Sequence, residues 1–385
     1  MLVNSKYTKF AALFFIQTLS RGLLLSVIPI QALSIFEDAQ RVSTLFFVIS
    51  IGGILGALGM PKIIAILGNY RGFLFGCSMM LISLVLLSFN EPLYFSIGLF
   101  CHVFSIAAVE VSFMLYILAR VPRAELTQFE PLRAFSTVLA LSVGPFFGVW
   151  LAEEVSHDAP FILSAVSALF SILYFRYLKL HQTHIRESHP LNENPLQYLW
   201  TFMKQPRLRL AYALVCARSS WWLMFVVYTP IYLIQMGVGE LVAAAVVSLG
   251  SAWTLSVPFW GWVGRKYGMR TLLVSGFSVA SILTMCVFGV SSLPMVTAVL
   301  LIFSALGTTM LDGAGNVLFY RAVKGKERSR MSAVFVTYRD FSNLTTPGLF
   351  AALLNFFTLP VVFFSASLWM AVAAWYCRYI PGQMK

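Results

Sequence analysis

Four charged residues of this chain lie deep inside long apolar segments, away from the polar loops. They are Arg21, Glu110, Arg218 and Asp312. A charge at mid-membrane costs about 2.5–3.5 kcal/mol on insertion scales, so a retained charge usually faces a cavity or a partner. A guanidinium group stays protonated and binds carboxylate or phosphate in a bidentate way, whereas a carboxyl group can take up and release a proton. The chemistry indicated is anion binding by the arginines and proton exchange by the acids.

Two interpretations of these four residues remain open from the sequence. In the first, Arg21 and Arg218 contact an anionic substrate. In the second, each arginine forms a permanent ion pair within its own half of the chain, Arg21 with Glu110 and Arg218 with Asp312. The two are compatible, because a substrate anion could compete with the acids. We predict that Glu110 and Asp312 take up and release the proton of a proton-coupled process, since burial favours a neutral carboxyl group and a nearby arginine favours a charged one.

Other polar side chains follow the arginines along the same segments. Gln17 precedes Arg21 by about one helical turn, and Trp222 and Tyr228 follow Arg218 in an aromatic-rich segment. We predict that these three residues contribute to substrate binding. The alternative for the two aromatic residues is an ordinary belt at the membrane interface.

The segment around Asp312 reads LDGAGNV, in which two glycines weaken a helix. Gly313 and Gly315 therefore predict a local break, which could direct backbone groups to a ligand or allow hinging. Close packing of helices by small residues is the alternative. Asn316, one turn after Asp312, is a further predicted substrate-binding residue.

Charged residues also stand at the expected cytoplasmic starts of two apolar segments. These are Arg133 in RAFS, and Arg339 with Asp340 in RDFS. Contacts at this position could form only when the inner mouth of a bundle is closed, so we predict a gating role for all three. The alternative is anchoring at the membrane interface.

The composition places these residues in a membrane protein. Of the 385 residues 59% are hydrophobic and 11% charged, and the mean hydropathy is +0.82, whereas soluble domains carry about 25% charged residues. A span needs about 20 apolar residues. Twelve segments qualify, near residues 10–33, 43–66, 72–89, 93–119, 132–151, 160–178, 210–235, 240–263, 270–291, 294–320, 332–356 and 358–379. The predicted fold is an all-α membrane protein of two six-helix bundles.

The distribution of positive charge predicts the orientation. With both termini in the cytoplasm, every Lys and Arg except Arg21, Arg41 and Arg218 falls on the cytoplasmic side, as the positive-inside rule requires. The net charge of +12 therefore reads as an orientation signal, and no nucleic-acid partner is expected. We predict a multi-pass protein of the inner membrane, with bundles at residues 1–180 and 208–385 and a cytoplasmic linker at 181–207.

The two halves repeat one another at an offset near 200 residues. Arg21 corresponds to Arg218, Gly68 and Gly76 to Gly268 and Gly276, Glu110 to Asp312, and Arg133 to Arg339, at offsets of 197, 200, 202 and 206. Since four matches occur in order, the repeat indicates two halves related by pseudo-twofold symmetry, with the charges at equivalent positions.

With this repeat and its local motifs, the chain resembles the major facilitator superfamily over nearly its whole length. GWVGRKYGMR resembles that family's glycine- and basic-rich turn, although Arg265 occupies the usual acidic position. The ALSVGPFFGV segment carries the Gly144-Pro145-x-x-Gly148 core of a motif associated with antiporters, with Ala140 and Val149 in place of its outer glycines. The resemblance implies two bundles that rock about a central site and a protein that acts as a monomer.

The leading functional prediction is a proton-coupled secondary transporter of a small organic anion or zwitterion. The alternative is a proton-driven multidrug efflux pump, against which two mid-membrane arginines argue because they would repel cationic drugs. No nucleophile–base pair, metal-ligand spacing or phosphate-binding loop indicates an enzyme. Neither a cofactor nor a metal is expected.

Overall fold

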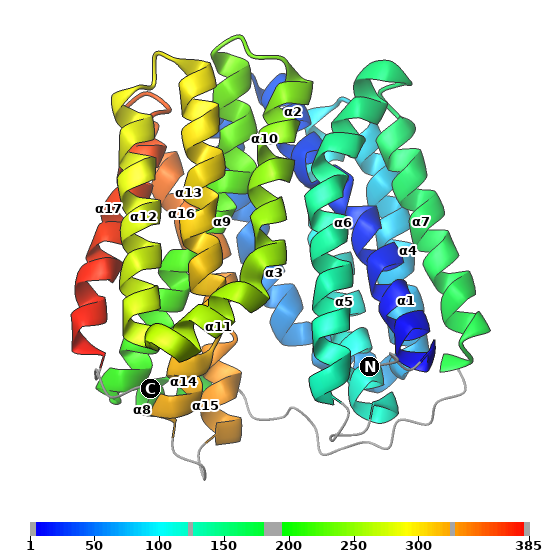
Figure 1. The fold of residues 1–385 in the computed structure, drawn as a ribbon. Coiled ribbons are helices and arrows are strands. Elements are labelled where there is room, and N and C mark those ends of the chain that lie inside the picture. The colour runs from blue at the N-terminus through cyan, green and yellow to red at the C-terminus, as the bar shows by residue number, and fades with distance from the viewer. Residues whose placement is uncertain (1–4, 122–125, 181–194, 324–327, 381–385) are drawn as a thin grey trace. The chain divides into compact units, whose positions relative to one another are not determined.

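The computed structural model describes residues 5–121, 126–180, 195–323 and 328–380, and within these ranges the regular elements are all helices (Figure 1). The chain forms two compact units. Unit 1 comprises Met1–Asp38 and Val48–His189, and unit 2 comprises Ala39–Phe47 and Pro190–Lys385. The predicted linker falls partly outside the described residues, and its remainder contains a short helix.

The helices of unit 1 are apolar, and all but one, which has 13 residues, approach or exceed the length of about 20 residues that a membrane span needs. They are α1 (Ser5–Gly22), α2 (Leu24–Phe36), α3 (Ala39–Leu67, of which the first nine residues belong to unit 2), α4 (Asn69–Ser88), α5 (Pro92–Arg120), α6 (Leu126–Glu154) and α7 (Ala159–Tyr177).

The helices of unit 2 include several shorter pieces. They are α8 (Pro195–Met203), α9 (Pro206–Gln235), α10 (Glu240–Ala252), the 3₁₀ helix η2 (Trp253–Ser256), α11 (Val257–Tyr267), α12 (Met269–Gly289), α13 (Pro294–Ala314), α14 (Val317–Ala322), α15 (Arg328–Phe335), α16 (Tyr338–Leu353), α17 (Val361–Tyr376) and the 3₁₀ helix η4 (Cys377–Tyr379).

Among the described residues, eleven helices are long and apolar enough to cross a membrane. The one predicted span that is not among these eleven, 332–356, is divided between α15 and α16, because the helix is interrupted at Val336 and Thr337. The predicted span 10–33 is likewise two helices, α1 and α2, that meet at Leu23. The prediction of an all-α membrane fold of two bundles is confirmed.

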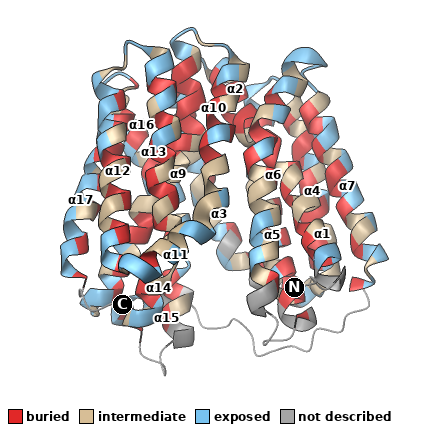
Figure 2. Cartoon of the chain, in the orientation of Figure 1, coloured by how far each residue is buried: buried red, intermediate tan, exposed pale blue. Residues whose placement is uncertain are grey.

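Each unit has its own apolar interior, and buried residues line the inward faces of the helices (Figure 2). In unit 1 the rings of Phe73 and Phe175 stack at 4.3 Å between centroids, and Phe73 also stacks on Phe113 at 5.4 Å. All three are buried. Aromatic pairs of this kind contribute about 0.5–1.5 kcal/mol beyond the area they bury. In lipid the hydrophobic effect contributes little to the association of helices, so close packing of this kind stabilises the bundle.

The repeat recognised in the sequence has a backbone counterpart at two glycines. Gly68 ends α3 with φ of 81°, and Gly268 ends α11 with φ of 100°. Both take up a conformation that side chains disfavour, and a new helix starts at the next residue in each unit. The matched glycines are therefore matched turns.

The Gly144–Gly148 motif of α6 packs directly on the backbone of α1 and α2. A Cβ atom at Gly148 would lie 1.8 Å from the carbonyl oxygen of Leu23, and one at Gly144 would lie 2.3 Å from the carbonyl carbon of Gly22. α6 runs without interruption through Pro145. This motif thus brings two helices into backbone contact, the mode of association that small residues permit in membranes.

We expect Gly148→Ala to destabilise the protein because the added methyl group has no room. Overpacking of this kind costs about 1–3 kcal/mol, so the detergent-solubilised variant should have a lower Tm and yield less monodisperse protein. Gly59→Ala in α3 is the matched control, since no atom lies within 4 Å of its added Cβ. An unchanged Tm in Gly148→Ala would contradict the close contact between α6 and Leu23.

Candidate functional site

In unit 1, Arg21 of α1 forms an ion pair with Glu110 of α5. The Nη1 atom of Arg21 donates to Oε1 of Glu110 at 2.6 Å, and the two side chains are 26% and 47% exposed. The structure thus brings together two residues that are 89 positions apart in the chain. Both side chains remain partly exposed, so the pair is not sealed inside the bundle.

The helix is interrupted directly after Arg21. Gly22 ends α1, Leu23 separates it from α2, and the carbonyl oxygen of Leu23 points at Gly148. Interrupted membrane helices place backbone groups at substrate and ion sites in transporters.

One turn before Arg21, the side-chain oxygen of Gln17 accepts a hydrogen bond from Ser171 of α7 at 2.8 Å. The side-chain oxygen of Gln17 is therefore engaged inside the bundle.

A buried histidine lies two turns before Glu110 on α5. His102 is 6% exposed, and its Nδ1 has no hydrogen-bond partner. Arg21 is close enough to interact electrostatically with it. Cys101 is its neighbour, yet no group of three or more His, Cys, Asp or Glu residues suited to a metal occurs in the described part of the chain.

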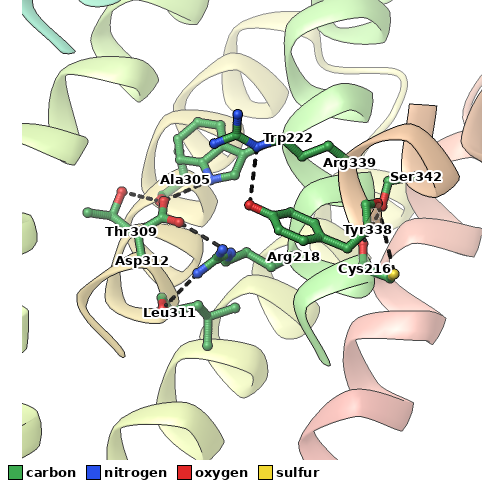
Figure 3. A network of polar contacts seen from close by, with 10 residues as sticks. All are labelled: Cys216, Arg218, Trp222, Ala305, Thr309, Leu311, Asp312, Tyr338, Arg339 and Ser342. Carbon is green, nitrogen blue, oxygen red and sulfur yellow. Dashed lines mark hydrogen bonds and ion pairs between the residues drawn. The ribbon is translucent and has the colours of Figure 1, made fainter. Parts of the chain in front are cut away.

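In unit 2, Arg218 of α9 and Asp312 of α13 form the corresponding pair (Figure 3). The Nε atom of Arg218 lies 3.3 Å from Oδ1 of Asp312, and its Nη1 donates to the carbonyl oxygen of Leu311 at 3.3 Å. The indole Nε1 of Trp222 donates to Oδ2 of Asp312 at 3.0 Å. Both carboxylate oxygens of Asp312 are therefore engaged, and Trp222, predicted to touch substrate, holds this acid.

Arg339 is a further member of this cluster. It stands on α16 beside Tyr338, to whose hydroxyl its Nε donates at 3.2 Å (Figure 3). Its charge also acts on Asp312. Asp312 thus interacts with two guanidinium groups that come from different helices, and Arg339 is more exposed than Arg218. The sequence had suggested only a gating position for Arg339.

The predicted break near Asp312 is present. α13 ends at Ala314, Gly315 takes φ of 52°, and Asn316 precedes α14. The amide of Gly315 donates to the carbonyl oxygen of Asp312 at 2.9 Å. In both units a helix is therefore interrupted within a few residues of a member of the charged pair.

Tyr228 is enclosed within unit 2. It is fully buried, and its hydroxyl donates to Oγ of Ser43, in the first turns of α3, at 2.9 Å. Its ring packs edge-on against Phe350 of α16 at 4.8 Å between centroids. In this conformation Tyr228 ties α9 to α3 and α16, and is not open to a solute.

The remaining predicted gating residues lie at helix starts. Arg133 donates through Nε and Nη2 to Oε2 of Glu130, at 3.0 and 2.7 Å, and its guanidinium lies over the ring of Phe14. Asp340 lies in the first turn of α16. Glu130 had not been foreseen, because the predicted span began near residue 132, whereas α6 begins at Leu126.

Long apolar helices in two units, each with a partly exposed arginine–carboxylate pair beside a broken helix, define a membrane transport protein. Its sequence between residues 10 and 255 matches the profile of the major facilitator superfamily. The chain belongs to that superfamily. The expected resemblance is thereby confirmed, and the protein is a multi-pass transporter. No individual curated sequence matches it significantly.

Solved structures of transporters share this fold. The nucleoside transporter NupG is 14% identical, with a TM-score of 0.76 over 97% of this chain and 98% of that one. A POT family transporter in complex with 5-aminolevulinic acid is 13% identical, with a TM-score of 0.74 over 94% of each chain. A D-xylose-proton symporter is 12% identical, with a TM-score of 0.73 over 98% of this chain and 99% of that one. At such identities the likeness concerns the fold.

Proposed function

We propose that this protein is a proton-coupled secondary transporter of a small organic anion or zwitterion, working by alternating access. The observation that supports this most is the pair of arginine–carboxylate contacts, Arg21 with Glu110 and Arg218 with Asp312. They occupy equivalent positions of the internal repeat, and each lies beside a helix break. An ion pair that only stabilised one bundle would not need a counterpart at the equivalent position of the other.

The anionic character of the solute rests on the arginines. A guanidinium group offers five donors in a fixed fork, which suits a carboxylate or phosphate. Arg21 donates to Glu110 through Nη1, and a quarter of its side chain is exposed. A solute anion can therefore approach the same guanidinium and compete with Glu110. Cationic drugs would meet repulsion at both arginines, which disfavours the multidrug alternative.

Proton coupling rests on the acids that hold the arginines. When Glu110 or Asp312 takes up a proton, its attraction for the arginine falls, and the guanidinium becomes free for the solute. Binding of the proton then raises the affinity for the anion, and binding of the anion raises the affinity for the proton by the same factor. Proton coupling on this fold has a precedent in the D-xylose-proton symporter, which agrees with the proposal. The named solutes of the similar transporters differ from one another, so the fold leaves the choice of solute to the side chains.

The location and state of the protein complete the proposal. Lys and Arg are concentrated in alternate connections, so both termini lie in the cytoplasm and the protein resides in the inner membrane. It acts as a monomer, with Arg133, Arg339 and Asp340 at the helix starts that close the inner mouth.

Uptake into proteoliposomes tests the proposal directly. A panel of radiolabelled carboxylates, phosphate esters and amino acids should contain at least one solute that accumulates when a proton gradient is imposed. Accumulation should disappear when a protonophore collapses the gradient. Transport restricted to cationic drugs, or uptake of every solute regardless of charge, would contradict an anion-selective carrier.

A further inference from the structure

One end of unit 2 carries three exposed tryptophans, each followed one helical turn later by a basic residue. The three tryptophan–cation pairs are Trp200 with Lys204, Trp262 with Lys266, and Trp375 with Arg378. Successive spans run in opposite directions, so α8, the start of α9 and the ends of α11 and α17 lie at the same end of the unit (Figure 1). The three tryptophans are 72%, 45% and 60% exposed. Large apolar rings therefore stand outside the protein interior at this end.

In each pair the cation lies over the indole ring. The distance from the charged group to the ring centroid is 5.7 Å at Trp200, 5.0 Å at Trp262 and 3.5 Å at Trp375. These distances fall within the range of about 6 Å over which a ring face attracts a cation. Each pair thus presents an apolar ring and a positive charge side by side, to a partner that has both apolar and negative parts.

The surrounding charge has one sign. The segments around the pairs, residues 195–215, 257–276 and 370–380, contain seven basic residues and no acidic one. All seven basic residues are exposed. An orientation signal needs only such charges, whereas the indoles that accompany them at a spacing of three or four residues are not required for it. The combination indicates a binding surface for an anion with an apolar part.

The helix α8 shows how this surface is oriented. It has nine residues and is not one of the apolar spans. Phe202 is fully buried and packs edge-on against Tyr212 of α9 at 5.8 Å between centroids. Leu199, Trp200 and Met203 are exposed, and at 100° per residue they lie roughly 60–160° around the helix from Phe202. A helix with an apolar outer face beside basic residues lies along the membrane surface.

We propose that this end of unit 2 binds anionic phospholipids of the adjoining leaflet. The basic side chains of the three pairs contact the headgroup phosphate, and the indoles lie among the first carbons of the acyl chains, the depth that tryptophan prefers. A free phosphate ion has no apolar part for the exposed rings, so the partner is the lipid. This surface is independent of the anion transport proposed above, because it uses neither Arg218 nor Asp312.

Fluorine NMR of the full-length protein, labelled with fluorotryptophan in phosphatidylcholine nanodiscs, tests the proposal. Replacing one tryptophan at a time with phenylalanine assigns the signals. Equal small amounts of phosphatidylglycerol or phosphatidylcholine, spin-labelled near the headgroup, are then added. At Trp200, Trp262 and Trp375 the phosphatidylglycerol label should broaden the signal about threefold to tenfold more, because one basic residue near an anionic leaflet favours binding about fivefold. High salt should reduce this preference by screening the charges.

Trp150 is a matched control within the same protein. It is exposed near the end of α6 and is followed at the same spacing by two acidic residues, Glu153 and Glu154. Its signal should show no preference for phosphatidylglycerol, because the neighbouring charges are negative. A preference at Trp150 equal to that at Trp200 would mean that the label reports the bilayer in general, and would overturn the proposal.

Charge removal at one pair provides the second control. Lys204→Gln combined with Arg207→Gln should abolish the phosphatidylglycerol preference at Trp200 and leave it at Trp262, whose signal also reports that the protein is folded. Equal broadening by both lipids at all three tryptophans of the parent protein would overturn the proposal. Absence of broadening at Trp200 with either lipid would show that protein covers α8, and would overturn it as well. The anion-transport proposal is unaffected by these outcomes, since no solute is transported in the experiment.

Discussion

In the Arg21→Ala variant, we expect the apparent affinity for the transported anion to fall about tenfold to hundredfold. Hydrogen bonds to charged groups contribute about 1.5–3 kcal/mol each, which corresponds to that range. Arg218→Ala should have a similar effect, because it is the equivalent residue of the repeat. The measurement is the KM for uptake of the solute identified in the panel, together with its Kd for the purified protein in detergent.

Controls must distinguish a lost anion contact from a broken ion pair, because Arg21→Ala leaves Glu110 without its partner. Truncating both residues, Arg21→Ala with Glu110→Ala, removes the uncompensated charge and should restore folding without restoring affinity. Exchanging them, Arg21→Glu with Glu110→Arg, keeps an ion pair between α1 and α5. If the exchanged protein transports normally, the pair is structural and the anion-binding role is wrong.

Lysine at position 21 offers a finer comparison. Arg21→Lys keeps the positive charge but replaces the planar fork with a single ammonium group. We expect an intermediate KM, because electrostatic attraction remains while bidentate geometry is lost. An equal KM in the lysine and arginine proteins would mean that only the charge matters at this position.

The charged pairs were accessible to sequence reasoning because the repeat marks them. A residue retained at the equivalent position of both halves, despite the cost of burying a charge, has few explanations other than a partner or a ligand. The break at Gly315 was also predictable, since glycine acts on the local backbone. The helix break depends on one segment of the chain, and the charged positions depend on the comparison of two segments.

Features that depend on how helices face one another were not predictable. Arg339 lies near Asp312 because α16 packs beside α9 and α13 in unit 2, and the spacing of residues along one segment does not contain this information. Trp222 bonds Asp312 because the indole turns toward α13. Spacing placed this tryptophan one turn after Arg218 and could not orient its ring. Tertiary packing decides such details, so the contact of Trp222 with Asp312 was not predicted, and its contact with substrate stays a prediction.

Glu110→Gln combined with Asp312→Asn should uncouple transport from the proton gradient while leaving exchange of the solute across the membrane. Glutamine and asparagine keep the shape and an acceptor oxygen, so Trp222 can still donate to position 312, but neither amide can release a proton at physiological pH. If one proton moves with each solute, a gradient of one pH unit supports about tenfold accumulation. The double variant should instead reach equal concentrations on both sides, at any imposed pH gradient.

Counterflow of unlabelled against labelled solute should persist in the double variant, which shows that the carrier still moves. Glu130→Gln on α6 is the matched control, because Glu130 is also a partly exposed acid paired with an arginine, Arg133. Whatever this change does to the rate, accumulation should still follow the pH gradient. If the double variant accumulates solute as the parent protein does, the coupling proton is carried elsewhere. His102, buried near Arg21 with Nδ1 unpartnered, is the residue to examine next, because an imidazole can take up a proton where a carboxyl group has been removed.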